Sequence, residues 1–386
     1  MSVAVDADAD GPLTLTGILL AGKSVKKLRE EGLFAAIIGM ALRAASALCL
    51  AVGLLSAPAR AEALDELYTK AKTEKSLVIY AGGPVSNYEP LAREFESKFP
   101  GLTVSIEGGF SNVLNQKIER QLSDQRLEAD MALFQTAQDF VRWTAQGKML
   151  AFKPEGFDVV DKSFKDPDGA FIVWYVGMLS YAYNTQQVKP ENAPKSALDF
   201  LKGEFRGKMI ACYPHDDDAT LYLFHTLAKK YGSDYIDKYL ANQPNWVQGH
   251  LSVSRSVAAG VNIVTLDATT STILNLKKAG QPIEFVFSDV DPIPIYYSTA
   301  GIFKDAPHPN VAKLYLTWVL APEQQRRIGS FSSRGDVPPP AGLKPLFSYG
   351  VANDYRAFVT NDRLLADLRN RFAAAIGPVR NTGGVR

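Results

Sequence analysis

Two adjacent tyrosines, Tyr296 and Tyr297, stand in the stretch PIYYSTAGIF, residues 294–303. Paired phenols are hard oxygen donors, of the kind that hold a ferric ion. The prolines and β-branched neighbours predict an extended segment, in which successive side chains point to opposite faces. A chelating pair is therefore disfavoured. We expect Tyr296 to contact a ligand and Tyr297 to pack inward.

A second stretch, YPHDDD from Tyr213 to Asp218, places a histidine beside three carboxylates. Such groups can ligate Ca²⁺ or a transition metal. Consecutive side chains do not all converge on one ion, and acidic residues at a helix start are favoured by the helix dipole alone. We therefore predict an acidic helix start and no metal, with Asp216 as a contact for a cationic ligand group.

Glycines and small polar residues follow several predicted strands, where helix N-termini aim unpaired N–H groups at a ligand. Each of these residues also fits an ordinary loop or helix cap. The candidate ligand contacts of this kind are Gly82, Gly83, Ser86, Ser111, Asn112, Gln135, Thr136, Thr269 and Thr270.

Arg334, in the stretch SSRGDVP, is a candidate anion-binding residue. Its guanidinium can pair with a carboxylate or phosphate in a two-bonded fork. The alternative is a structural salt bridge, for which Asp336 is the nearest partner in sequence.

Strand and helix patterns alternate from residue 77 onward, which predicts an α/β fold with mainly parallel sheets. Two extended segments, residues 170–185 and 282–303, are too long for ordinary strands of one small sheet. We expect them to cross between two lobes. The predicted lobes are residues 62–178 with 293–386, and residues 179–292, each built on a mixed, mainly parallel sheet.

The N-terminal region has the pattern of an export signal. Residues 40–61 combine Arg43, an apolar run after it and an A-x-A cleavage motif at Ala59 and Ala61, so we predict a cleaved signal peptide and a start at Met40. Residues 1–39 are then an extension outside the native chain; a longer signal is the alternative. Cys212 is the only cysteine after the signal and is predicted to be buried in a strand.

Four stretches of the sequence together resemble the extracellular solute-binding proteins of ABC importers, with the ferric-ion and thiamine branch as the most similar group. These stretches are YAGGPVSNYEPLAREFESKFPGLTVSIEGG, YNT, FRGKMIACYP and GIFKDAPHPNVAKLYLTWVLAPEQQ, and the resemblance spans residues 75–340. It implies a periplasmic type II binding fold, a ligand held in a cleft between lobes that close by hinge bending, and delivery to a membrane permease.

The ferric members of that family carry a histidine just after the first strand and paired tyrosines after a strand of the second lobe. Here the corresponding stretches are YAGGP and TLDATTSTIL, which contain neither. We therefore expect a small organic solute with a polar or anionic group, and no metal or cofactor. Trp174, Tyr175 and Tyr296 are candidates to contact its organic body. The alternative is a transport protein that binds ferric ion.

Two other function classes are a secreted hydrolase and a solute-sensing receptor domain. A secreted hydrolase is disfavoured because the sequence has no G-x-S-x-G elbow and no H-E-x-x-H motif. A solute-sensing receptor domain stays open. The net charge of +1 gives no electrostatic reason to expect nucleic acid as a partner, and we expect a monomer.

Overall fold

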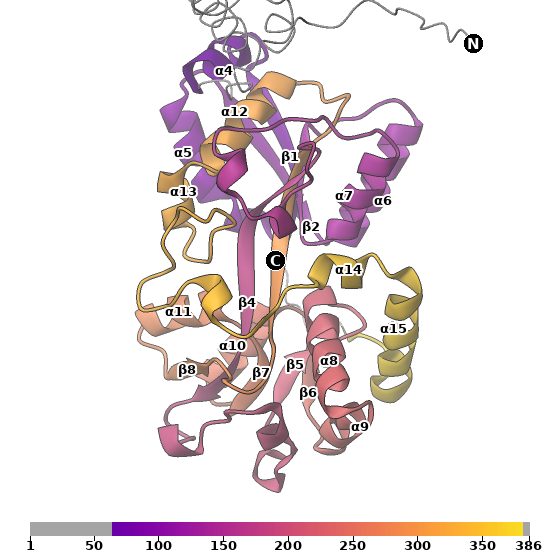
Figure 1. The fold of residues 1–386 in the computed structure, drawn as a ribbon, viewed down its shortest axis with the longest axis vertical. Coiled ribbons are helices and arrows are strands. Elements are labelled where there is room, and N and C mark those ends of the chain that lie inside the picture. Colours follow the sequence, from indigo (N-terminus) through magenta and orange to yellow (C-terminus); the bar gives the residue numbers. More distant parts are fainter. Residues whose placement is uncertain (1–63, 381–386) are drawn as a thin grey trace, which may run out of the picture. The chain divides into compact units, whose positions relative to one another are not determined.

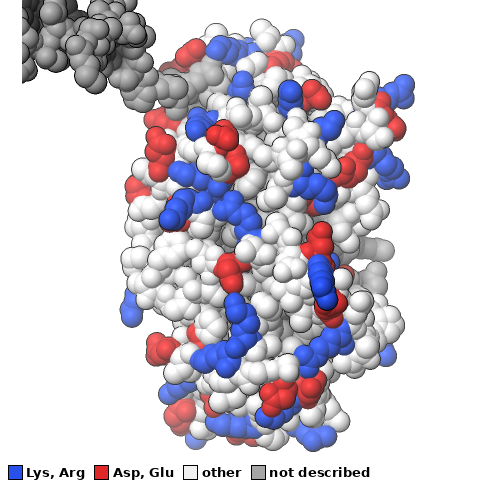
Figure 2. Space-filling model, turned by 45° about the vertical axis from the view of Figure 1, so that its right-hand side comes forward, with Lys and Arg blue, Asp and Glu red and all other residues white. Residues whose placement is uncertain are grey.

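The structure is a computed structural model that describes residues 64–380. The predicted extension 1–39 and the signal peptide 40–61 lie outside this described part. Within residues 64–380, no helix combines the length and the apolar character needed to span a bilayer. Figure 2 shows positive and negative side chains interspersed on the face that it presents, rather than gathered into a patch of one sign.

Three parallel strands form the first part of the structure, in the order β2-β1-β3. Each strand is followed by a helix, as the alternating sequence pattern predicted. Phe95 and Ile118, on the apolar faces of two of these helices, are fully buried. The elements are α4 (Leu64–Ala71), β1 (Ser76–Gly82), α5 (Glu89–Lys98), β2 (Thr103–Gly109), α6 (Ser111–Ser123), β3 (Met131–Phe134) and α7 (Ala137–Ala145).

Two long strands, β4 (Ile172–Asn184) and β9 (Ile293–Ile302), connect this part to the rest of the fold (Figure 1). They pair antiparallel with each other, and β9 also pairs with β3. Along β4 the pairing changes partner: it pairs with β9 up to Met178 and with β7 from Leu179. We call the β1–β3 side of this point the first lobe and the β7 side the second lobe.

The second lobe joins β4 to two antiparallel neighbours, β7 and β8, and carries a separate parallel pair, β5 with β6. The fold is thus a mixed α/β arrangement of two lobes joined by extended strands, as predicted. A mainly parallel sheet was expected in each lobe, whereas in the second lobe β7 and β8 both pair antiparallel with β4, and the parallel pairing is that of β5 with β6. The elements are β5 (Ile210–Cys212), α8 (Asp218–Tyr231), α9 (Asp234–Ala241), β6 (Asn245–Val247), α10 (His250–Ala258), β7 (Val264–Thr269), α11 (Thr270–Lys278) and β8 (Ile283–Val286).

The C-terminal segment contacts both lobes. Helix α12 (Pro309–Val319) packs against α4 of the first lobe, and α13 (Pro322–Arg327) follows it. After β10 (Val351–Ala352) and α14 (Tyr355–Val359), helix α15 (Asp362–Ile376) lies beside α8 and α9 (Figure 1). The sequence assigned all of residues 293–386 to the first lobe, whereas α15 contacts the second.

Ring packing and an ion pair hold α15 in that place. The rings of Phe372 and Phe224 have centroids 5.1 Å apart. Arg371 donates to Asp237 of α9 at 2.8 Å. The sequence of α15 predicted a helix but not its neighbour, because an apolar face at helical spacing does not specify which element covers it.

Short 3₁₀ helices complete the connections between the longer elements. They are η1 (Val85–Asn87), η2 (Phe157–Val159), η3 (Lys162–Phe164), η4 (Pro190–Asn192), η5 (Ala197–Leu201), η6 (Gly203–Phe205) and η7 (Leu346–Ser348).

Candidate functional site

The two adjacent tyrosines of β9 point to opposite faces of the strand. Tyr297 packs against the rings of Phe164 and Tyr355, with centroids 5.7 Å and 5.2 Å away. Tyr296 instead lies parallel to the imidazole of His250, with ring centroids 6.1 Å apart and planes within 4°. The period of two along an extended strand explains the difference. The pair therefore does not converge on one point.

Tyr296, on β9, meets a second phenol, that of Tyr175 on β4. Burial, followed by the interactions with the Tyr175 hydroxyl and the charge of Asp217, raises the pKa of Tyr296 well above its ordinary value. The Tyr175 hydroxyl lies 3.0 Å from the Oγ of Ser271, in the first turn of α11. Two phenols, one from β4 and one from β9, thus interact with each other, and the one from β4 reaches the first turn of α11 in the second lobe.

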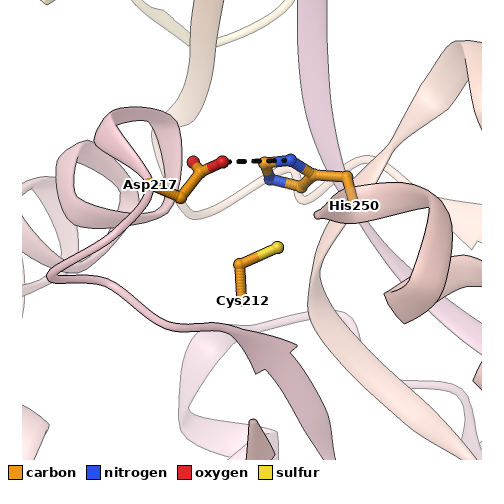
Figure 3. A group of neighbouring side chains, drawn as sticks. All are labelled: Cys212, Asp217 and His250. Atoms are coloured by element: carbon orange, nitrogen blue, oxygen red, sulfur yellow. Dashed lines mark ion pairs between the residues drawn. The ribbon is translucent and has the colours of Figure 1, made fainter. Parts of the chain in front are cut away.

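A buried polar cluster lies on the other side of Tyr296. His250 begins α10, and its Nε2 lies 3.1 Å from Oδ1 of Asp267 on β7. Its Nδ1 lies 3.6 Å from Oδ2 of Asp217, the N-cap of α8. Cys212, at the end of β5, faces the same imidazole (Figure 3). Four elements of the second lobe therefore meet at this histidine.

Asp267 holds the cluster together. Its Oδ2 accepts hydrogen bonds from the backbone N–H of Cys212 at 2.8 Å and from the Thr220 hydroxyl at 2.9 Å. Its side chain is fully buried. A buried carboxylate is stable only when such donors or an opposite charge compensate its lost hydration. Here the compensation comes from β5, α8 and α10 together.

The protonation states follow from these contacts. Burial alone would lower the pKa of His250, but the neighbouring Cys212, Asp217 and Asp267 outweigh burial and raise it well above its ordinary value. Burial raises the pKa of the Cys212 thiol to about 12. At neutral pH the imidazole is therefore charged between two carboxylates, and the thiol keeps its proton. A fully buried, protonated thiol is a poor nucleophile.

A further polar contact joins the lobes directly. Gln138 of α7 donates from Nε2 to Oδ2 of Asp218, the first residue of α8, at 3.3 Å. Arg369 of α15 forms an ion pair with the other oxygen of Asp218. The Oε1 of Gln138 is buried and has no hydrogen-bond partner among the described residues.

The glycines at the end of β1 bring three elements of the first lobe together. A side chain at Gly82 would place its Cβ 2.4 Å from the Oγ of Ser111, so glycine permits this close approach. Gly83 adopts a positive φ of 106°, and its N–H donates to the carbonyl of Gly109 at 2.7 Å. Ser86 and Asn112 are exposed beside this junction. These predicted contacts thus share one edge of the first lobe.

The other predicted helix-start hydroxyls already have partners. Thr136 donates to Asp139 at 2.6 Å, and Thr269 donates to the Thr272 hydroxyl at 2.6 Å. Thr270 donates to the Met178 carbonyl at 2.9 Å. Gln135, just before Thr136, is exposed. For these threonines the hydroxyls stabilise the local fold.

Two charged candidates are engaged elsewhere. The Arg334 guanidinium is buried and donates to both oxygens of Asp336, at 2.8 Å and 2.7 Å, and to the Leu320 carbonyl at 3.2 Å. This is the structural salt bridge that the sequence offered as the alternative to anion binding. Asp216 is exposed and accepts a hydrogen bond from Gln248 at 2.8 Å.

Comparison with known proteins gives two findings, and both point to solute-binding proteins. Residues 129–260 match the family model of a bacterial extracellular solute-binding protein. Iron-bound HitA from Pseudomonas aeruginosa superposes with a TM-score of 0.66 and 19% identity, covering 77% of this chain and 99% of that one. The chain has the fold of a periplasmic solute-binding protein. The resemblance predicted from the sequence is thereby confirmed.

Other proteins with this solute-binding fold differ in ligand. AfuA from Actinobacillus pleuropneumoniae, with fructose-6-phosphate bound, has a TM-score of 0.66 and 20% identity, covering 78% of this chain and 99% of that one. A ferric binding protein from Campylobacter jejuni has a TM-score of 0.63 and 18% identity, covering 77% and 99%. None of the curated proteins compared with the chain matches it.

Several residues of this solute-binding fold were not predicted as site members from the sequence. These residues are His250, which contacts Tyr296; Asp267, which contacts Cys212; and Ser271, which contacts Tyr175. Each contact is formed only by the tertiary fold. One signal was present: Asp267 is an acidic residue inside the apolar strand NIVTLDA, and a carboxylate in such a place needs buried partners.

Proposed function

We propose that the protein is the substrate-binding component of an ABC importer. In the periplasm it would hold a small polar organic solute between its lobes and deliver this solute to a permease in the membrane. The observation that carries this proposal is the pairing of Tyr296 with Tyr175, whose hydroxyl reaches Ser271 in the first turn of α11. Phenol hydroxyls and a helix N-terminus bind hydroxyl and anionic groups, while the rings cover an organic body.

The ligand class follows from the groups that surround this point. Arg334 is paired with Asp336, so the support for an anionic group rests on the N–H groups of the helix starts. Asp217 and Asp267 lie near Tyr296 and favour a ligand that presents hydroxyl or amine donors. A solute with both kinds of group, such as a sugar phosphate, fits this arrangement.

Ferric ion is the second candidate, and one observation favours it. Tyr175 and Tyr296 place two phenol oxygens together from different strands, so a two-tyrosine site does not need the adjacent pair. Phenolate and carboxylate oxygens are hard donors, which suit a ferric ion.

A thermal-shift screen of the exported chain distinguishes these ligands. Sugar phosphates and ferric citrate are the probes, and a true ligand at ~100 times its dissociation constant stabilises the protein by roughly 2.7 kcal/mol. Tyr296→Phe should remove most of this shift, whereas Tyr297→Phe, on the opposite face of the same strand, should retain it. An equal response of both variants contradicts this site.

Each ligand leaves a separate signature. Ferric binding through a phenolate gives a visible charge-transfer band that Tyr296→Phe abolishes. An organic solute gives the stabilisation without colour. In both cases small-angle scattering should show a smaller radius of gyration at saturation, since closure brings the lobes together. An unchanged radius counts against a cleft between mobile lobes.

A further inference from the structure

The cluster around His250 has the donor atoms of a metal site that differs from the tyrosine site. One ligand atom each from Cys212, Asp217 and His250 lies within 4.8 Å of the other two (Figure 3). The three residues come from three different elements: the end of β5, the N-cap of α8 and the first residue of α10. The fold therefore brings together donors that the sequence separates widely.

The contact between Asp267 and His250 fixes the orientation of the imidazole. Nε2 of His250 lies 3.1 Å from the buried Oδ1 of Asp267, so Nε2 carries the proton and donates it to that oxygen. The other nitrogen, Nδ1, then faces Asp217, whose Oδ2 is 3.6 Å away. A carboxylate that orients a histidine in this way is the usual outer partner of a metal-binding imidazole.

The types of the donor atoms select the kind of metal. A thiolate, an imidazole and a carboxylate together suit zinc and similar divalent transition ions, whereas calcium, magnesium and ferric ion prefer oxygen ligands alone. Three protein ligands leave a fourth position for water or for a group of a solute.

Access to this cluster is one-sided. The Asp217 side chain is 25% exposed and that of His250 is 14% exposed, while Cys212 is sealed inside. An ion can therefore enter past the carboxylate of Asp217 and reach the sulfur last. The ring of Tyr296, on β9, stacks on the imidazole, which places the cluster next to the proposed solute contact.

We propose that Cys212, Asp217 and His250 bind one divalent transition-metal ion of the zinc class, with Asp267 as the residue that positions His250. Binding replaces two protons by the ion: the thiol proton of Cys212 and the Nδ1 proton of the imidazolium leave to solvent, and the Nε2 proton stays on its hydrogen bond to Asp267. The inference does not depend on the identity of the transported solute.

Cobalt(II) is the probe that tests this assignment, because its spectrum reports ligand type as well as binding. We expect the metal-free protein to bind one Co²⁺ with an ultraviolet sulfur-to-cobalt charge-transfer band and intense visible bands of a four-coordinate ion. One equivalent of Zn²⁺ should displace the cobalt and abolish both. Binding without the sulfur band, or no saturable binding, overturns the proposal.

Three variants make the test specific. Cys212→Ser should lose the charge-transfer band, and Asp217→Asn should keep it with affinity lowered at least ten-fold, because asparagine preserves the cap of α8 but not the charge. His225→Gln is the control, since His225 stacks on Phe358 outside the cluster and should bind as the unaltered chain does. Circular dichroism confirms that each variant is folded; equal cobalt spectra in all three overturn the proposal.

The solute response separates this proposal from the function proposed above. The cobalt titration uses no solute, so its failure leaves the transport proposal intact. Conversely, Tyr296→Phe should lose the solute-induced thermal shift and keep the sulfur-to-cobalt band. Loss of that band in this variant would contradict the assignment of different residues to the metal site and the solute site.

Discussion

The ring of Tyr296 on β9 lies against the backbone of Gly177, its pairing partner on β4. A Cβ at Gly177 would stand 2.2 Å from Cζ of Tyr296, closer than two such atoms can approach. The lack of a side chain at Gly177 on β4 therefore leaves room for the phenol of Tyr296 on β9.

Gly177→Ala should displace Tyr296 and destabilise the protein by about 1–3 kcal/mol, the usual cost of overpacking a buried site. Chemical denaturation measures the free energy of unfolding. Gly203→Ala is the matched control, because nothing lies within 4 Å of a Cβ built there. If both variants unfold alike, Gly177 has no special packing role.

Asp291→Asn should destabilise the second lobe in a pH-dependent way. Burial alone would raise the pKa of Asp291, but hydrogen bonds from Tyr231, Lys230, Ala197 N–H and Tyr181 outweigh it and hold that pKa below its ordinary value. A depressed carboxyl pKa contributes stability above the unfolded value, near 4, and loses it as pH falls through the folded value.

The free energy of unfolding should therefore differ between Asp291→Asn and the unaltered chain by about 1.5–3 kcal/mol at pH 7, since these hydrogen bonds go to a charged group. The difference should shrink as pH falls below 4. Asp289→Asn, in the same loop but exposed, should show little change at any pH. A difference that is constant from pH 7 to pH 3 contradicts the role assigned to the charge.

Arg334→Ala should lower stability by about 1–3 kcal/mol, because it leaves the buried Leu320 carbonyl without this donor and Asp336 without its ion pair. Thermal unfolding is the measurement, and Arg363→Ala on the exposed face of α15 is the control. Loss of the solute-induced shift at unchanged stability would instead support the anion contact expected from the sequence.

Asp218→Asn should loosen α15. The substitution removes the charge that pairs with Arg369, while an amide oxygen stays available to Gln138. Amide hydrogen exchange should accelerate in α15 and stay unchanged in β1–β3. Asp237→Asn removes the more exposed pair with Arg371 and should have the smaller effect. Equal acceleration in the two variants would show that burial of the pair does not matter.

The sequence predicted the parts of the site that follow from local periodicity. The opposite orientations of Tyr296 and Tyr297 follow from strand alternation alone, and Cys212 is buried in a strand as expected. These predictions need only the extended conformation, not the position of any distant element.

Contacts between distant elements could not be predicted in this way. Asp267 reaches the backbone of Cys212 across 55 residues, and only the placement of β5 beside β7 brings them together. For the YPHDDD stretch the sequence predicted an acidic helix start without metal, because only neighbours along the chain could be compared. The histidine that faces Asp217 is His250 from α10, and not the neighbouring His215.

The course of the chain after α13 has a practical consequence. Helix α4 is anchored to α12 in the first lobe, and α15 is anchored to α8 and α9 in the second. The chain therefore passes between the lobes a third time, after β4 and β9. A donor fluorophore on α4 and an acceptor on α15 would therefore sit on different lobes, and their energy transfer would test the proposed closure without any label in the proposed solute site.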